Sequence, residues 1–141
     1  MADYACPSAQ PDMENARVLG VVEATDRGPR VAYLTGREQV HPRALNVPDE
    51  MVNLVVRISA KCENARCAQF ADGRCGLGER IAKMLPDVVD ALPPCNIRRT
   101  CRWHAEQGSA ICFKCPQVAT LVPRDDSDLA QAARPTAQAG V

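Results

Sequence analysis

The order of apolar and polar residues divides the chain into a β-rich first half and a helical second half. Residues 17–24 (RVLGVVEA) and 30–35 (RVAYLT) are short runs rich in β-branched side chains, separated by the turn-forming residues 25–29 (TDRGP). This arrangement predicts a β-hairpin. A third run of the same kind, residues 51–58 (MVNLVVRI), predicts another strand, which leads directly towards Cys62.

Helical spacing begins after the first cysteines. Between residues 77 and 92, large apolar side chains recur at intervals of three and four, which predicts a helix. Pro86 lies inside this stretch and predicts either a kink or the start of a second short helix. Pro93 and Pro94 end the element, and residues 96–111 predict a further helix that stops at Gly108.

The expected fold class is therefore α+β. A small antiparallel β-sheet over residues 17–58 is followed by a helical, loop-rich, metal-binding cysteine region. Residues 1–16 are polar and contain proline, and we expect a flexible lead there. Residues 17–122 are expected to form a single metal-binding domain, with a β part at 17–58 and a cysteine-rich part at 59–122. Residues 123–141 are rich in Pro, Asp, Ala and Gln and predict a disordered tail.

Composition and charge narrow the function classes. Aromatic residues make up only 4% of the 141 residues, which leaves room for a metal to contribute folding free energy. Lys and Arg number 17, as do Asp and Glu, and this balance argues against a dedicated nucleic-acid binder. Residues 61–115 are nevertheless basic, with nine Lys and Arg against six Asp and Glu, an excess that would offset the charge of thiolates.

The cellular compartment follows from what the chain lacks. Residues 1–20 contain acids and prolines and no apolar run of the length found in a signal peptide. No stretch reaches the length of an apolar membrane span. We therefore expect a cytoplasmic protein, with no membrane partner. Disulfides are uncommon in that compartment, so the eight cysteines are interpreted as metal ligands or redox groups.

Seven of the eight cysteines fall within 54 residues, and these seven are the predicted metal ligands. They are Cys62, Cys67, Cys75, Cys95, Cys101, Cys112 and Cys115. The eighth, Cys6, is isolated in the N-terminal lead and is interpreted as an incidental thiol.

Two cysteine spacings favour metal binding. Cys112-x2-Cys115 and Cys62-x4-Cys67 each allow two thiolates to converge on one centre. The proline after Cys115 is similar to the end of ferredoxin cluster loops, although the full run of cysteines in those loops is missing. The complete arrangement matches no metalloprotein motif, so the interpretation depends on the residues alone.

The number of ligands allows several sites. Four cysteines would hold one [4Fe–4S] cluster, and three would hold a cluster with an open iron. Seven cysteines with His104 would hold two zinc ions. A surface position beside a buried Trp103 is the alternative for His104. Spacing alone leaves open which cysteines share a site.

We favour iron–sulfur over zinc for two reasons. The cysteine spacing lacks the regular pairs of zinc ribbons, and several arginines flank the thiols, where they would offset the negative charge of a cluster. These are Arg66, Arg74, Arg98, Arg99 and Arg102. The alternative is that they form an ordinary solvated helix face. Trp103 and Phe113 are expected to pack around the centre and limit the access of water.

The leading hypothesis is an iron–sulfur protein, of the [4Fe–4S] type, that acts in electron transfer, in redox sensing or as an accessory subunit of a larger enzyme. The alternative is a zinc-stabilised interaction module without a redox role. In both cases we expect a partner protein and no nucleic acid. No hydrolase, phosphate-binding or dinucleotide-binding motif occurs. An enzyme that uses an open iron or a reactive thiol is a third hypothesis.

Overall fold

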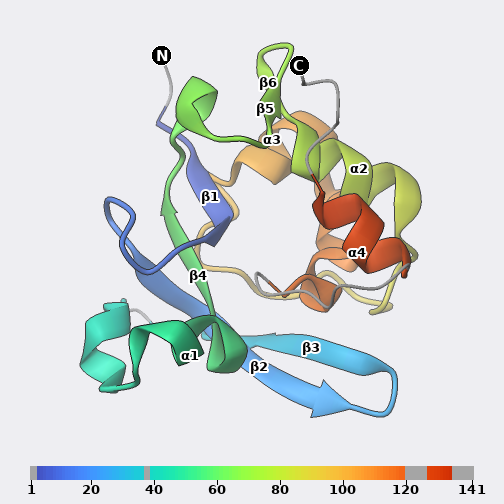
Figure 1. Cartoon of the computed structure of the whole chain (residues 1–141). Coiled ribbons are helices and arrows are strands. Elements are labelled where there is room, and N and C mark those ends of the chain that lie inside the picture. Colours follow the sequence, from blue (N-terminus) through green and yellow to red (C-terminus); the bar gives the residue numbers. More distant parts are fainter. Residues whose placement is uncertain (1–2, 37–38, 120–126, 135–141) are drawn as a thin grey trace.

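The fold combines an antiparallel sheet with short helices, which confirms the α+β class (Figure 1). The computed structural model describes residues 3–36, 39–119 and 127–134. In these residues the strands of a four-stranded sheet run in the order β1 (Ala5–Ala9), β4 (Val56–Lys61), β2 (Arg17–Thr25) and β3 (Gly28–Tyr33). Every neighbouring pair is antiparallel.

The predicted β-hairpin is confirmed. Strands β2 and β3 pair from Gly20 opposite Tyr33 to Thr25 opposite Gly28. The hydroxyl of Thr25 donates a hydrogen bond to the carbonyl of Gly28, and this bond closes the turn. At the bottom of Figure 1 the hairpin extends away from helices α2, α3 and α4.

The predicted strand at 51–58 is wrong for residues 51–55. These residues belong to helix α1 (Asp49–Val55), and strand β4 begins only at Val56. The β-branched composition suggested a strand, but Asp49 and Glu50 place negative charge in the first helical turn, where the helix dipole favours it. Val52 is the buried residue of this helix, so packing of one face outweighs the weak local preference.

The segment expected to be a flexible lead contains strand β1. This strand lies at the edge of the sheet, with Cys6 opposite Ala60 of β4. The amide of Ala5 also donates a 2.8 Å hydrogen bond to the carbonyl of Thr100. Pro7 lacks a backbone donor, which an edge strand tolerates. Because proline is uncommon within strands, the sequence around Pro7 did not predict β1.

The helical half is built from short elements. Helix α2 (Gly76–Met84) ends before Pro86, because the residue preceding a proline avoids the helical conformation, and Leu85 is extended. The expected helix over 77–92 therefore stops at Met84 and does not restart. Helix α3 (Arg102–Gln107) covers part of the expected 96–111 and ends at Gly108, as predicted.

The remaining elements are brief. Helix α4 (Asp128–Ala133) lies within the expected tail; the other residues of 123–141, apart from Ser127 and Arg134, are outside the described part of the chain. Strands β5 (Phe70–Ala71) and β6 (Arg74–Cys75) form a small hairpin. The 3-10 helices are η1 (Pro42–Leu45), η2 (Asn64–Arg66), η3 (Ser109–Phe113) and η4 (Cys115–Gln117).

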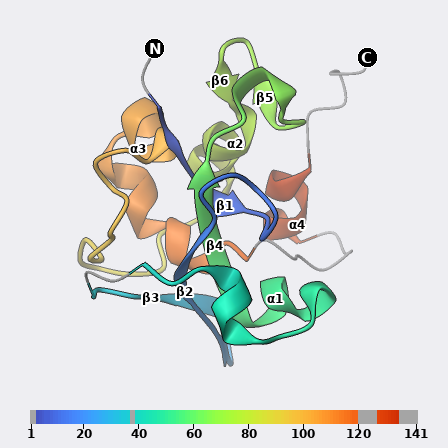
Figure 2. The same ribbon diagram turned by 90° about the vertical axis from the view of Figure 1, so that its left-hand side faces the viewer.

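Strand β4 divides the core into two parts. Successive side chains of a strand point to opposite faces. Val56, Ile58 and Ala60 pack in one apolar cluster with Val52 of α1. The intervening Arg57 points towards the helical half, where a second cluster surrounds Trp103. Figure 2 shows β1 and β4 side by side, with α3 to their left and α4 to their right.

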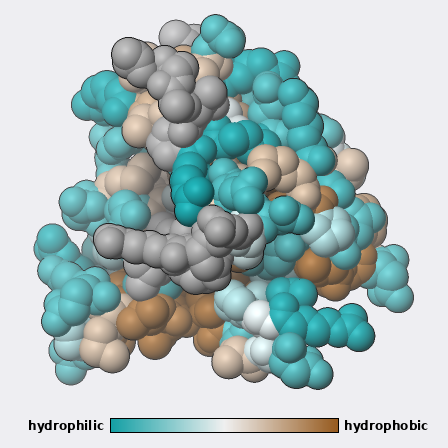
Figure 3. All heavy atoms as spheres, turned by 45° about the vertical axis from the view of Figure 1, so that its right-hand side comes forward, coloured by the Kyte–Doolittle hydropathy of each residue, from teal (hydrophilic) through white to brown (hydrophobic). Residues whose placement is uncertain are grey.

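Charged and polar groups cover much of the surface. The face in Figure 3 is mostly hydrophilic, with hydrophobic side chains gathered in its lower half. The large hydrophobic residues that are exposed among the described residues are Val21, Met51, Leu54, Val55 and Leu92. Among the described residues, no helix has the length and apolar composition needed to span a membrane.

Candidate functional site

The eight cysteines form two sets of four, and each set lines its own cavity. All eight are free thiols in the structure. Quartet A, around cavity A, consists of Cys6, Cys62, Cys67 and Cys75. Quartet B, around cavity B, consists of Cys95, Cys101, Cys112 and Cys115. The chain thus brings together cysteines that are as many as 69 residues apart, counted from Cys6 to Cys75.

Quartet A is assembled from the edge of the sheet and two short loops. Cys6 lies on β1, and Cys62 follows the last residue of β4. Cys67 ends η2, and Cys75 ends β6, opposite Phe70. The β5–β6 turn consists of Asp72 and Gly73, both with positive φ, which is the turn that suits a two-residue hairpin.

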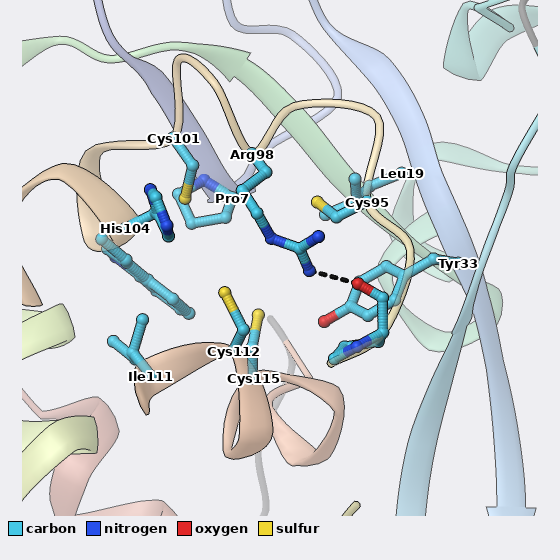
Figure 4. Close-up of a pocket in the computed structure, with 12 residues that line it drawn as sticks. Pro7, Leu19, Tyr33, Cys95, Arg98, Cys101, His104, Ile111, Cys112 and Cys115 are labelled. Carbon is cyan, nitrogen blue, oxygen red and sulfur yellow. Dashed lines mark hydrogen bonds between the residues drawn. The ribbon is translucent and has the colours of Figure 1, made fainter. Parts of the chain in front are cut away.

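Quartet B comes from the loops around α3. Cys101 immediately precedes this helix, and Cys95 lies in the extended segment before it. Cys112 and Cys115 lie on η3 and η4, so this C-x2-C pair takes 3-10 form. Figure 4 shows the four sulfur atoms around a central space into which the side chain of Arg98 extends.

The cavities are small spaces between the thiols. The volume open to the centre of a water molecule is about 50 Å³ in cavity A and about 20 Å³ in cavity B. The guanidinium of Arg98 crosses the space of cavity B and donates to the carbonyl of Pro93 (Figure 4). Nε of Arg98 is buried and has no hydrogen-bond partner within the described part of the chain.

Backbone amides point at six of the eight sulfur atoms. The amide of Asn64 donates to Sγ of Cys62, and that of Gln69 donates to Sγ of Cys67, each at 3.4 Å. The donor lies two residues after the cysteine in both cases. The same relationship holds at Cys6 and Cys95, whose donors are Ser8 and Ile97. At Cys75 and Cys101 the amide three residues on, of Gly78 and His104, donates as well as the amide two residues on, of Leu77 and Trp103. Amides so placed favour negative charge on sulfur.

Burial has the opposite effect on the metal-free thiols. It raises the pKa of Cys6 and of Cys101 to about 12, and it also raises the pKa of Cys75 and of Cys95. Neighbouring thiols of the same quartet add to the shift at Cys6 and Cys101. These groups are therefore protonated at neutral pH, and a cationic centre that binds them would release their protons.

A fully buried arginine contacts quartet B. Arg57, on the face of β4 that points to the helical half, has 0% exposure. Its Nη2 donates a 2.8 Å hydrogen bond to Sγ of Cys115, and its other nitrogens donate to the carbonyls of Pro7, Cys115 and Val118. No carboxylate of the described residues pairs with it. Burial opposes its charge, but Cys115 and Tyr33 outweigh burial and raise its pKa.

A second buried arginine contacts quartet A, and this one has an anionic partner. Nη1 of Arg102 lies 2.8 Å from Oε2 of Glu106, and the pair is about 90% buried. The guanidinium stacks over the rings of Tyr4 and Phe70, with its carbon 4.5 and 5.4 Å from their centroids. Oε1 of Glu106 accepts a 2.9 Å hydrogen bond from the amide of Cys75. The ion pair therefore holds α3 against the cysteine loops of quartet A.

Trp103 separates the two cavities. It is 1% exposed, and it lines both cavity A and cavity B. Its indole N–H donates to Cys75 of quartet A. Its ring centroid lies 5.3 Å from the guanidinium carbon of Arg57, which in turn contacts Cys115 of quartet B.

The structure distributes the predicted site residues between the quartets. Three of the seven predicted cysteines belong to quartet A and four to quartet B. His104 lines cavity B, where its Nε2 lies 3.2 Å from Oγ of Ser109. Of the five arginines considered, Arg98 and Arg102 approach the thiols, and the exposed ones are Arg66, Arg74 and Arg99. Among the described residues, no three His, Cys, Asp or Glu side chains form a group that could hold a single metal ion.

Sequence reasoning missed two residues. Cys6, interpreted as incidental, is the fourth member of quartet A. Cys6 is 56 positions from the next cysteine, so spacing did not connect it with the others. The total of eight cysteines, enough for two sites of four, was a signal that could have assigned it. Arg57 was also missed. A lone charge within the apolar run VVRISA signals a buried partner for that charge, because a buried guanidinium needs one.

Comparison of the chain with models of known protein families, with curated proteins and with solved structures finds no match. The function is therefore argued from the site itself.

Proposed function

We propose that the protein holds two [4Fe–4S] clusters, one in each quartet, and transfers electrons. The observation that carries this proposal is the division of all eight cysteines into two sets of four, each lining a cavity. Four thiolates are the ligand set of such a cluster. The proposal extends the prediction from the sequence, which required only one site and gave Cys6 no role.

Hydrogen-bond donors and cations near the thiols would stabilise a negatively charged cluster. Backbone amides point at six of the sulfur atoms, and hydrogen bonds to sulfur are among the features that tune cluster potentials. Within the described residues, Nε of Arg98 near quartet B and Nε of Arg102 near quartet A are buried without a hydrogen-bond partner. Arg102 already has Glu106 as its counter-charge, whereas Arg98 forms no ion pair with a described residue, so an anionic cluster would provide the counter-charge that Arg98 lacks.

The spread of the thiols favours a cluster over zinc. A zinc ion draws four sulfur atoms to about 2.3 Å from one point. A cluster is larger, because each sulfur binds a different iron, so its four ligands need not converge on one point. Among the described residues no three His, Cys, Asp or Glu side chains form a group that could hold a single metal ion, whereas four thiols line each cavity.

Complete ligation favours electron transfer over catalysis. With four protein thiolates, each iron of a [4Fe–4S] cluster has a protein ligand, so no iron is open to a substrate. Each cluster then accepts or gives one electron. The partners we propose are a one-electron donor protein and a one-electron acceptor protein. The acceptor or donor can be a larger enzyme of which this chain is an accessory subunit. The compartment we propose is the cytoplasm.

The decisive experiment is metal and sulfide analysis of protein purified without air, or reconstituted with ferrous iron and sulfide. We expect a brown protein with about eight iron and about eight sulfide per chain. A colourless protein with stoichiometric zinc and no sulfide would overturn the proposal in favour of a zinc-stabilised module. About four iron per chain would restrict it to one quartet.

Cys6 provides the sharpest variant. We expect Cys6→Ala to lose about half of the iron, and Cys112→Ala to lose the other half, because each removes one ligand of four. Met13→Leu is the matched control, since Met13 lines cavity A without being a proposed ligand and the swap conserves volume. Full iron content in Cys6→Ala would show that Cys6 is not a ligand.

A further inference from the structure

We infer that the two clusters have unequal reduction potentials, that the cluster of quartet B has the higher one, and that an electron received at quartet A passes across Trp103 to quartet B. This inference rests on the proposed function and adds to it a direction of electron flow. Three observations carry it: the position of Trp103, the charges near quartet B and the charges near quartet A.

The position of Trp103 gives a direct connection between the sites. One side chain forms part of the wall of both cavities, so the two clusters would be separated by a single aromatic ring at this point. Gly78 allows this close packing: a Cβ at that position would lie 2.8 Å from Cδ1 of Trp103. The ring is fixed by α2 on one side and faces Arg57 on the other.

The charges near quartet B are positive. Arg57 contacts Sγ of Cys115 directly and has no carboxylate partner among the described residues. Arg98 lines the same cavity, and its guanidinium crosses the space between the four sulfur atoms (Figure 4). A cluster in that space would displace the guanidinium to the wall of the cavity, where its charge would remain close to the cluster. The described residues that line cavity B include no Asp or Glu.

The charges near quartet A are balanced or negative. Arg102 approaches Cys62, but Glu106 neutralises it at 2.8 Å, and both groups are buried. Arg80 lies near Cys75, and the neighbouring Glu79 opposes its charge. Glu63 is in the wall of cavity A, and the residues that line this cavity include no Lys or Arg. The two quartets therefore have the same number of thiols in environments of different charge.

This difference determines the order of reduction. Reduction adds one negative charge to a cluster, and a nearby positive charge stabilises the reduced form and raises the potential. Arg57 acts through a medium of low dielectric, where its charge is weakly screened. The internal step is balanced: the reduced cluster A loses one electron, the oxidised cluster B gains it, and no proton moves. The electron comes from a low-potential one-electron donor protein and leaves to an acceptor of higher potential.

The first test uses single-cluster forms of the full-length protein. Cys6→Ala/Cys67→Ala leaves quartet B, and Cys95→Ala/Cys112→Ala leaves quartet A. Redox titration followed by electron paramagnetic resonance then gives the potential of each remaining cluster. We expect the higher potential in the form that retains quartet B. Equal potentials or the reverse order would overturn the inference.

The second test assigns the cause to Arg57. In the two-cluster protein, Arg57→Gln removes the charge and should lower only the higher potential, whereas Arg57→Lys keeps the charge and should shift it less. Arg99→Gln is the matched control, because Arg99 is exposed and its charge is screened by solvent. If Arg57→Gln does not fold, Arg98→Gln serves instead, with the same expected direction. A shift of neither potential, or of both equally, would contradict the role of the charge.

The third test addresses the connection. In the doubly reduced protein, clusters on either side of one ring should show spin–spin interaction, which each single-cluster form should lack. Two independent spectra would contradict close contact across Trp103. Absence of iron and sulfide would instead refute the proposed function itself, so the two failures are distinguishable.

Discussion

The guanidinium of Arg57 donates a 2.8 Å hydrogen bond to Sγ of Cys115, a residue 58 positions further along the chain. The same group donates to the carbonyl of Pro7 at 2.6 Å and to that of Val118 at 3.2 Å. One buried side chain of β4 therefore holds together the edge strand β1 and the segment around η4. These two segments form the sheet side and the loop side of the wall of cavity B.

Replacement of Arg57 should destabilise the fold as well as alter a potential. In Arg57→Met the carbonyls of Pro7, Cys115 and Val118 lose a buried donor, and each unsatisfied group costs about 1–3 kcal/mol. After partial relaxation we expect a loss of about 3 kcal/mol and a fall in Tm of about 10 °C. Thermal unfolding of the metal-loaded protein measures it. Arg99→Met, at an exposed position, should change stability by less than about 0.5 kcal/mol; similar effects of the two changes would contradict the structural role.

Packing of α2 against Trp103 predicts a second destabilising change. Gly78→Ala would improve the intrinsic helix propensity by about 1 kcal/mol. The added Cβ would, however, lie 2.8 Å from Cδ1 and 3.1 Å from Cγ of the buried indole. Such overpacking costs about 1–3 kcal/mol, so we expect a net loss of stability. Gly36→Ala is the control, because no atom of a described residue other than its chain neighbours lies within 4 Å of its Cβ position. A Gly78→Ala protein more stable than the parent would show that the indole moves freely.

Local sequence patterns correctly predicted elements that are set by turn residues, β-branched runs or a helix-ending glycine. The turn at residues 25–29 and the β-branched runs on either side identified β2 and β3. Gly108, with φ of +79°, ended α3 where expected. At residues 51–55 the same reasoning failed, since β-branched composition does not reveal that Asp49 and Glu50 begin a helix with one buried face.

The cysteines could be counted from the sequence, but their division into quartets could not be predicted from spacing. The metal hypothesis stays a prediction. That division depends on contacts between distant segments. Strand β1 places Cys6 in cavity A and its neighbour Pro7 in cavity B, because successive side chains of a strand point to opposite sides. The short sequence ACPSA contains no periodic signal that would reveal this strand.

The raised thiol pKa values predict how the metal-free protein responds to pH. Cys6 and Cys101 have a pKa of about 12 against an ordinary value of 9.0. Their protonated forms therefore contribute stability that is complete below about pH 9 and is lost as pH rises towards 12. At pH 9 we expect iodoacetamide to alkylate both residues roughly 100-fold more slowly, or slower still, than in the urea-unfolded chain, because the thiolate is the reactive form. Peptide mass spectrometry reads each site, and equal rates in the two states would contradict the buried, protonated thiols.

Trp103 supplies an optical test of the two-cavity arrangement, since it is the only tryptophan of the chain and lines both cavities. An iron–sulfur cluster absorbs in the range of indole emission, so loading with iron and sulfide should quench most of the fluorescence. Zinc thiolates do not absorb there, and zinc loading is the control that separates quenching from folding. Each single-cluster form should still be strongly quenched, because the ring borders whichever cavity is filled. Quenching by one cluster and not by the other would contradict the position of Trp103 between them.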